Sequence, residues 1–320
     1  MPSVRRPIRG SRGFYPKKRA RRIYSKIKSY PKSSEAKPLT FSGYKAGMTH
    51  VMIMDSNPNA RVKGQQIFKP VTIIDCPPLS IFGFAAYEHS LDGLKSITTV
   101  YAEKLSENLK RAMKVPKKSD NAKKLDGRQV ARIRLLCHTN PGFKKAPEVF
   151  EVGLGGDPAK QLEYARLMLG KELKISEVFK PSDYVDVIGV SKGKGFQGPV
   201  KRFGVRVLGR KFQQMHRKIG AHGQTEPGKV RSTIPQAGQL GFQTRTELNR
   251  RILKISPAKD VTPVNGFLRY GKLSGDALML EGSVVGPTKR MIRIRASIRP
   301  PKTKYAADVR YVSVSSKQGV

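Results

Sequence analysis

Three glycines in the sequence have the spacing found in loops that bind dinucleotides. Gly193, Gly195 and Gly198 form the pattern G-x-G-x-x-G, and the alternation of residues 183–190 predicts a β-strand directly before them. In a dinucleotide-binding fold the third glycine opens a helix whose N-terminus holds the pyrophosphate. An acidic residue about 20 positions later then binds the ribose.

The residues after these glycines do not meet those demands. Gly204 and Gly209 interrupt the next segment, which has no apolar stripe at helical spacing. No Asp or Glu occurs between Asp186 and Glu226. A phosphate loop of the Walker type is excluded as well, because Gly198 is not followed by Lys and then Ser or Thr. The pattern therefore favours a glycine-rich turn after a strand, and we predict no bound cofactor.

Cysteine and histidine, the other residues with reactive side chains, are scattered. Cys76 and Cys137 lie in apolar, strand-like runs and in no C-x-x-C pair, so we expect both to be buried and unreactive. The histidines are His50, His89, His138, His216 and His222. None of them has the spacing of a metal ligand set. We predict no metal site and no catalytic residue.

Basic residues surround the glycines. Residues 191–255 contain fifteen Lys or Arg and two acidic residues, Glu226 and Glu247. Glycine lets a backbone approach phosphate closely, and the interleaved cations neutralise its charge. This composition predicts a surface that binds the phosphates of a polymer.

The composition of the whole chain agrees with a polyanionic partner. The 320 residues carry a formal net charge of +40, with a pI near 10.5. Such a charge repels itself unless a nucleic acid neutralises it. A membrane surface is the other candidate polyanion, but no apolar run approaches the ~18 residues of a membrane span and no signal peptide is visible. We therefore expect a cytosolic protein without a membrane partner.

The first 32 residues form a basic segment. They contain twelve Lys or Arg, no acidic residue, and the aromatic residues Phe14, Tyr15, Tyr24 and Tyr30. A segment of this charge cannot bury a core, so we expect it to be disordered alone. A solvated tail or a nuclear-import signal would have a similar composition. The interleaved aromatic residues favour RNA, bound through phosphate pairing and base stacking.

Alternation of apolar and polar residues predicts a chain rich in β-strands. The predicted strands are 50–55, 71–76, 131–137, 149–152, 183–190, 266–273, 277–286, 290–299 and 309–316. Helical spacing is seen in 105–113 and in the run after Asp157 and Pro158, which form a helix start with Leu162, Ala165 and Leu169 on the buried side. Residues 205–250 contain few large apolar residues, so we expect an extension that leaves a barrel or sheet and returns to it.

One predicted strand has two contrasting faces. In residues 290–299 the apolar face consists of Ile292, Ile294, Ala296 and Ile298, and the basic face consists of Arg293, Arg295 and Arg299. The alternation indicates one face in the core and the other on a phosphate backbone. A solvated arginine face is an equally good interpretation.

The stretch around the glycines and three further blocks carry a family signature. Around the glycines the signature residues are Phe179, Asp186, Gly189, Ser191, Gly193, Lys194, Gly195, Gly198 and Arg202. The further blocks are 43–50, 230–253 and 282–290. Through these residues, which span nearly the whole chain, the sequence resembles the universal large-subunit ribosomal protein three family in its archaeal form.

The resemblance implies a mainly β fold with an α/β insert, built on a closed β-barrel of the translation-protein type. Residues 1–40 would be a basic N-terminal extension and 81–179 the insert. The barrel domain would comprise 41–80 and 180–320, with 205–250 as an extended loop that penetrates RNA.

The resemblance also implies a function without catalysis. The chain would be a structural constituent of the large ribosomal subunit that organises its RNA, aids early assembly and contacts neighbouring ribosomal proteins in the cytoplasm. The tip of the extension, at 219–232, would reach toward the peptidyl-transferase centre. Gln224 resembles a glutamine that bacterial members methylate, but Glu226 interrupts the match, and Thr225 stands where some members have tryptophan. An RNA-modifying enzyme that uses the glycine turn for a cofactor, or a chromatin-like DNA-binding protein, are the alternatives.

The predicted RNA-binding residues combine the basic segments with the family blocks. They are Arg5, Arg6, Arg9, Arg12, Lys17, Lys18, Arg19, Arg21, Arg22, Lys45, Lys192, Lys194, Lys201, Arg202, Arg210, Lys211, Arg217, Lys218, Gln224, Lys229, Arg231, Arg245, Asn249, Arg250, Lys289 and Arg290.

Overall fold

The computed structural model describes residues 12–114, 125, 128–223, 226, 228–306 and 308–315. The chain divides into two compact units, which are described separately. The first unit consists of Met1–Ile23 and Val190–Arg245, and the second consists of Tyr24–Gly189 and Thr246–Val320. The predicted barrel and insert share the second unit, and their division into separate domains stays a prediction.

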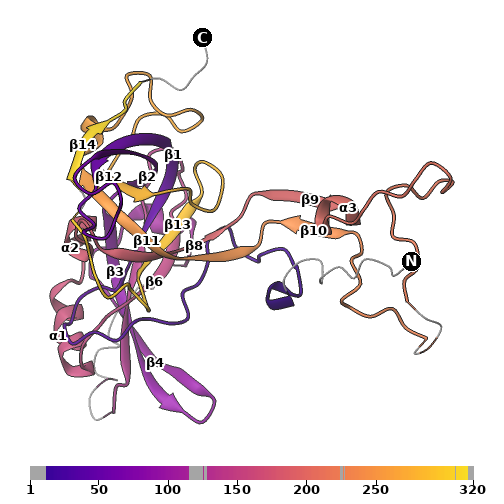
Figure 1. Ribbon diagram of the computed structural model, residues 1–320. Helices are drawn as coiled ribbons and strands as arrows, with labels where there is room; N and C mark the ends of the chain where they lie inside the picture. The colour runs from indigo at the N-terminus through magenta and orange to yellow at the C-terminus, as the bar shows by residue number, and fades with distance from the viewer. Residues whose placement is uncertain are drawn as a thin grey trace. The chain divides into compact units, whose positions relative to one another are not determined.

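A seven-stranded antiparallel sheet dominates the second unit (Figure 1). In spatial order its strands are β13 (Met291–Ala296), β8 (Tyr184–Val190), β11 (Thr244–Ser256), β12 (Asp276–Glu281), β2 (Gln66–Cys76), β1 (Thr40–Met54) and β14 (Asp308–Val312). β13 also pairs with β1, with Thr40 opposite Arg295 and Tyr44 opposite Met291. Six strands therefore form a ring of pairings in which each has a partner on both sides.

Six of the predicted strands belong to this sheet, but the one predicted at 266–273 is wrong. These residues form a tight loop with an isolated bridge between Phe267 and Gly271. Gly266 and Gly271 have positive φ angles of 74° and 97°, which favour glycine and interrupt an extended chain. Phe267, Tyr270 and Leu273 are buried, so their apolar character reflects packing of the loop and not strand alternation.

A second sheet lies in the predicted insert. Its strands are β4 (Gly93–Tyr101), β3 (Leu79–Ser90), β5 (Arg132–His138) and β6 (Val149–Gly153), and β7 (Glu172–Leu173) pairs with β3. One apolar cluster joins the two sheets, because Phe41 and Ile73 of the first belong to the same core as Phe84 and Leu135 of the second. The described chain is therefore mainly β.

The helices are few and short. The predicted helix after Asp157 is confirmed as α1 (Pro158–Leu167), with Ala165 buried; Gln161 is also buried, and its side chain accepts a hydrogen bond from the backbone of Ile133. Residues 105–113 form only a 3-10 helix, η2 (Glu107–Arg111). Further short helices are α2 (Ile175–Val178), α3 (Pro199–Phe203), η1 (Arg12–Phe14) and η4 (Ala258–Asp260). No helix in the described ranges is long and apolar enough to cross a bilayer.

In the second unit, the residues before β1 are packed against the insert. The Tyr24 hydroxyl donates to the carbonyl oxygen of Val149 at 2.8 Å, and Ile27 is buried. The ring of Tyr30 lies against Gly153, where any side chain would collide with it. We call residues 24–39 the strap. The prediction that residues up to 32 bury nothing is wrong for this part, because spaced apolar and aromatic residues find places on an existing sheet.

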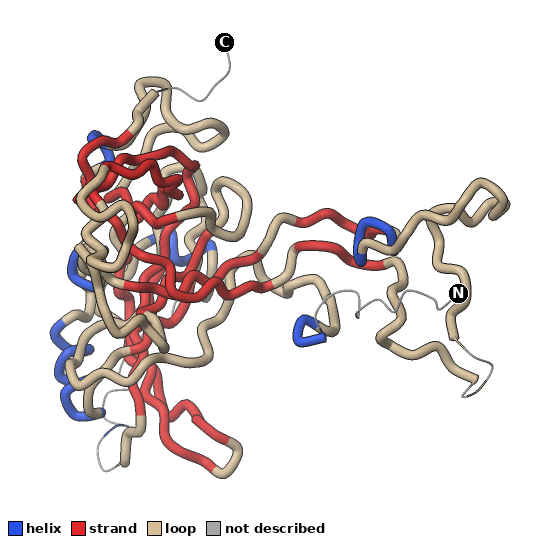
Figure 2. Tube along the Cα trace, in the orientation of Figure 1, coloured by secondary structure: helices blue, strands red, loops and turns tan. Residues whose placement is uncertain are grey.

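The first unit contains little regular structure. β9 (Gly193–Gln197) pairs with β10 (Gly238–Gly241), and α3 (Pro199–Phe203) follows β9 (Figure 1). The glycine-rich stretch is thus a strand and not merely a turn, because backbone pairing requires no side chains. Figure 2 draws the described residues between α3 and β10 as loop, and they contain neither helix nor strand.

Candidate nucleic-acid interface

Positive charge is concentrated in the first unit. Its two segments contain twenty-one Lys or Arg and one acidic residue, Glu226. These 79 residues of the 320 thus hold half of the formal net charge of +40. Folding such a unit requires contacts that offset the repulsion among its cations.

A lysine between two aromatic rings provides one of these contacts. The rings of Tyr15 and Phe203 are stacked, with centroids 6.2 Å apart, and the amino group of Lys17 lies 5.3 Å from each centroid. Burial, and then the charges of Arg245 and Arg202, lower the pKa of Lys17. The attraction of the cation to the ring faces therefore stabilises a site that charge repulsion alone would open.

Arginines and aromatic rings hold residues 14–20 in the same way. The guanidinium of Arg245 lies 4.3 Å from the ring centroid of Phe14, and that of Arg19 lies 5.3 Å from the ring of Phe242. The backbone of Ala20 donates to the carbonyl of Phe242 at 2.8 Å. Phe14 and Tyr15, which the sequence suggested as base-stacking residues, thus contact side chains of their own unit.

Arg202 connects α3 with β10. Its Nε donates to the carbonyl of Gln239 at 3.1 Å, and its Nη1 donates to the carbonyl of Gln236 at 2.9 Å. A side chain at Gly238 would collide with this guanidinium, since its Cβ would lie 2.8 Å from Nη1. Arg202 therefore has a positioning role, and its predicted contact with RNA stays a prediction.

Most of the other predicted residues present their charge to solvent. The exposed ones are Lys18, Arg19, Arg21, Arg22, Lys192, Lys194, Lys201, Arg210, Lys211, Arg217, Lys218, Lys229, Arg231, Asn249 and Lys289. The partly buried ones are Lys17, Lys45, Arg202, Arg245, Arg250 and Arg290. Arg5, Arg6, Arg9, Gln224 and the side chain of Arg12 lie outside the described residues. RNA binding by any of them remains a prediction.

The predicted residues in the second unit are spread over several elements. Lys45 of β1 donates to the carbonyl oxygens of Val284 and Gly286, so it fixes a neighbouring loop. The amino group of Lys289 lies 5.7 Å from the ring centroid of Phe143. The backbone of Lys45 also hydrogen-bonds with Lys289 and Arg290, so these three predicted residues are neighbours.

The arginines of β13 contradict the interpretation of a phosphate-facing or solvated face. Arg293 is 2% exposed and Arg295 is 5% exposed. Nη2 of Arg293 donates to the carbonyl of Glu151, and its guanidinium lies 4.3 Å from the ring of Phe150. Burial lowers the pKa of Arg293 to about 10, so it keeps its charge at neutral pH. The face is covered because the insert sheet packs over it.

Arg295 pairs with a buried carboxylate. Its Nη2 donates to Oδ2 of Asp186 at 2.6 Å, and its Nη1 donates to the carbonyl and hydroxyl of Ser29 in the strap at 2.9 and 2.8 Å. Ile298, which the alternation assigned to the core, is 41% exposed because β13 ends at Ala296. Arg299 is exposed, as a solvated residue would be.

The glycine motif does not form a nucleotide site. β9 pairs with an antiparallel neighbour, whereas a dinucleotide fold requires a parallel βαβ unit. α3 has only five residues and ends at Gly204, whose φ is 65°. The described residues contain no cluster of three metal-ligating side chains. Cys76 and Cys137 are buried, as predicted, and burial raises the pKa of both thiols, that of Cys137 to about 12.

Two aromatic residues of the first unit were missed by the sequence reasoning. Phe196 is 79% exposed and Phe212 is 54% exposed. Phe196 follows Lys194 by two residues, and Phe212 directly follows Lys211. The signal that singled out the N-terminal aromatics, rings interleaved with cations, was present here too. Exposed rings among cations suit unpaired bases.

The second unit is mainly β, and the first unit exposes cations and aromatic rings, a combination typical of proteins that bind polyanions. A family model for "Ribosomal protein L3" matches residues 1–319. Similar proteins, each named "Large ribosomal subunit protein uL3", come from Methanothermobacter thermautotrophicus (42% identical, 98% of both chains), Archaeoglobus fulgidus (41%, 98% of both) and Nanoarchaeum equitans (41%, 97% of both). The chain belongs to the ribosomal protein L3 family.

Proposed function

We propose that this chain is a structural constituent of the large ribosomal subunit and binds and organises the ribosomal RNA there. The observation that carries the proposal is the concentration of half the net charge, with exposed cations and rings, in one unit of the chain. The names of the archaeal relatives support the assignment to the large subunit. RNA is the polyanion that such a particle supplies, and neutralisation of its phosphates by these cations would aid early assembly.

The ring of six paired strands fits a closed β-barrel of the translation-protein type. We propose that residues 41–80 and 180–320 form this barrel domain and that 81–179 are an α/β insert. Residues 205–250 would be the loop that penetrates RNA, preceded in the chain by the basic extension of residues 1–40. Pairing of β13 with β1 supports closure.

We further propose that residues 219–232 reach toward the peptidyl-transferase centre and act there by positioning RNA. Lys229 and Arg231 are exposed, so they are suited to contact phosphate. The partners would be large-subunit RNA and neighbouring ribosomal proteins, with no small-molecule substrate and no membrane, and the location would be the cytoplasm. Neither an RNA-modifying enzyme nor a chromatin-like protein gains support from an observation on this chain.

The test compares matched sets of exposed lysines. The triple variant Lys192→Gln, Lys194→Gln, Lys201→Gln changes the first unit. The control, Lys95→Gln, Lys104→Gln, Lys110→Gln, makes the same charge change on exposed residues of the second. Binding to a large-subunit RNA fragment is measured against salt. The first variant should make the negative slope of log K against log salt shallower by about 2 to 3, since each phosphate contact contributes roughly 0.7 to 0.9 to its magnitude.

Sedimentation tests whether the protein is bound to the large ribosomal subunit. The protein should travel with the large subunit through a sucrose gradient at salt concentrations that remove DNA-binding proteins. Equal slopes for the two triple variants would contradict the assignment of the interface to the first unit. Migration at the top of the gradient, or with DNA, would contradict the ribosomal role.

A further inference from the structure

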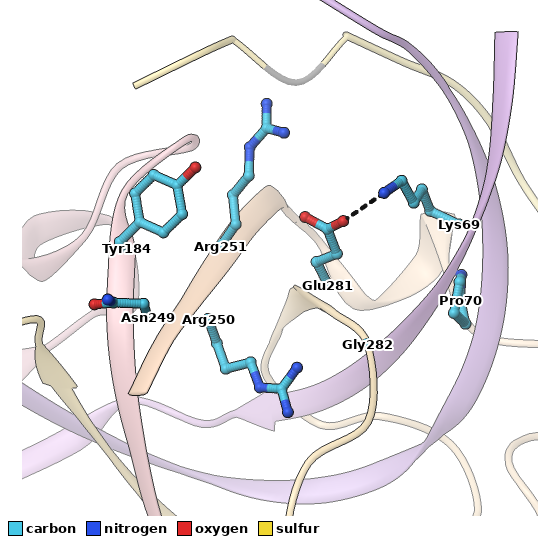
Figure 3. Close-up of a pocket in the computed structure, with 8 residues that line it drawn as sticks. All are labelled: Lys69, Pro70, Tyr184, Asn249, Arg250, Arg251, Glu281 and Gly282. Carbon is cyan, nitrogen blue, oxygen red and sulfur yellow. Dashed lines mark ion pairs between the residues drawn. The ribbon is translucent and has the colours of Figure 1, made fainter. Parts of the chain in front are cut away.

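A pocket in the second unit lies among β2, β8, β11 and β12 and encloses about 320 Å³ (Figure 3). Lys69, Tyr184, Asn249, Arg250, Arg251 and Glu281 supply its polar and aromatic lining. This volume is at the lower end of the range of roughly 300–1,000 Å³ that is typical of pockets for small ligands. It is therefore large enough for a single nucleotide base.

Partly buried hydrogen bonds of Asn249 shape the wall of the pocket. Asn249 has a φ of 54°, in the left-handed region, and its backbone N–H donates to Oδ1 of Asp186 at 3.1 Å. The hydroxyl of Ser297 donates to the side-chain oxygen of Asn249. Arg250 and Arg251 follow this residue in β11, and both border the pocket.

The pocket is cationic and contains hydrogen-bond donors without acceptors. Three cations border it against one carboxylate. Lys69 pairs with Glu281 at 3.0 Å, and Arg250 pairs with Glu247, which lies outside the lining, at 3.3 Å. Nη2 of Arg251 donates to the carbonyl of Tyr305 at 2.8 Å. The Nε atoms of Arg250 and Arg251 are buried, and neither has a hydrogen-bond partner within the part of the chain that the structure describes. Buried donors of this kind are costly unless a ligand supplies acceptors.

We infer that this pocket binds a short unpaired stretch of RNA, with phosphates on Arg250 and Arg251 and one base beside Tyr184. Guanidinium groups match phosphate in geometry and charge, and an aromatic ring suits an unstacked base. The Glu281 carboxylate repels phosphate but accepts hydrogen bonds from base N–H groups. In Figure 3 the two arginine side chains project in different directions, which fits successive phosphates better than a single free anion. The inference rests on RNA as the partner of the proposed function.

The first experiment uses the full chain and a fluorescent single-stranded RNA hexamer, with a hexamer duplex for comparison. Salt near ~0.2 M weakens non-specific phosphate contacts. Arg251→Gln should reduce affinity for the single strand about tenfold, the size expected for lost hydrogen bonds to a charged group, with a much smaller effect on the duplex. Lys254→Gln is the control, because Lys254 is an exposed residue of the same strand outside the pocket and loses the same charge.

A second measurement uses the unaltered protein. A hexamer that carries a photoreactive 4-thiouridine should cross-link to peptides containing Tyr184 or Lys69. If Arg251→Gln does not fold, Lys69→Gln should show the same selective loss of single-strand binding. Equal losses in Arg251→Gln and Lys254→Gln, cross-links confined to the first unit, or displacement of the hexamer by inorganic phosphate alone would each overturn the inference. Failure of the protein to sediment with the large subunit is a separate result and bears on the proposed function only.

Discussion

The buried ion pair between Asp186 and Arg295 should be one of the strongest determinants of stability in the second unit. The side chains are 1% and 6% exposed. Asp186 accepts hydrogen bonds from Arg295, from the backbone of Asn249 and, at 3.3 Å, from the backbone of Ile298. Asp186→Asn leaves the guanidinium charge buried without compensation. Removing one member of a buried pair costs about 3–5 kcal/mol of unfolding free energy.

The loss of stability in Asp186→Asn can be compared with the loss caused by breaking an exposed ion pair elsewhere in the same unit. Lys304 and Asp183 lie 2.7 Å apart, with side chains 53% and 30% exposed. Lys304→Gln should cost no more than about 1 kcal/mol, because solvent screens such pairs. Urea unfolding, followed by far-UV circular dichroism because the chain has no tryptophan, should show a midpoint more than about 1 M lower for Asp186→Asn, given a slope of roughly 1–3 kcal/mol per M.

A double variant separates the pair from its surroundings. Asp186→Asn with Arg295→Met removes both charges, so the combined loss should be smaller than the sum of the single losses by about 0.5–3 kcal/mol. Strict additivity would show that the two groups are not coupled. A loss for Asp186→Asn no greater than that for Lys304→Gln would refute the reasoning from burial altogether.

Three further expectations concern other parts of the chain. Deletion of residues 1–23 should lower the salt dependence of RNA binding by several units of slope, each phosphate contributing roughly 0.7–0.9, while far-UV circular dichroism shows the second unit still folded. Lys229→Gln with Arg231→Gln should change unfolding free energy by no more than about 0.5 kcal/mol per residue but alter aminoacyl-tRNA binding by purified subunits; normal binding would remove residues 219–232 from the function. Burial lowers the pKa of His138 below its ordinary value of 6.5, so the unfolded chain binds this proton more readily and stability should fall as pH drops through 6.5. Urea midpoints at several pH values should show a weaker fall in His138→Gln.

Strand alternation identified most of the large sheet, and it failed where a second layer or a close backbone contact decides the structure. In β13 the pattern correctly separated isoleucines from arginines. It contained no information on whether the arginine face would meet phosphate, water or another sheet, and the insert covers it. β9 was missed because glycine-rich strands have no side-chain pattern.

The candidate site shows the same division between composition and geometry. The positive charge of the first unit could be counted from the sequence. Its described lysines other than Lys17 are exposed, as a phosphate-binding surface requires. The sequence could not predict that Arg202 and Arg245 support neighbouring backbone and rings, because their partners are backbone carbonyl groups and the ring of Phe14, which have no signature in the sequence. The packing of the strap could not be predicted from the sequence, because the ring of Tyr30 fits only against the bare backbone of Gly153, which is distant in sequence.

β1 and β13 pair with each other but are synthesised at very different times. β1 leaves the translating ribosome early, but Arg295, the partner of Thr40, is made near the end of the chain. At about 5–20 residues per second, roughly 10 to 50 seconds pass before that partner exists. During this interval one side of β1 has no permanent neighbour and is open to pairing with other nascent chains. A chaperone that covers this edge of β1 would protect it, and we expect that slower translation of residues 55–290 increases aggregation of the nascent chain, measured as the insoluble fraction of newly made protein.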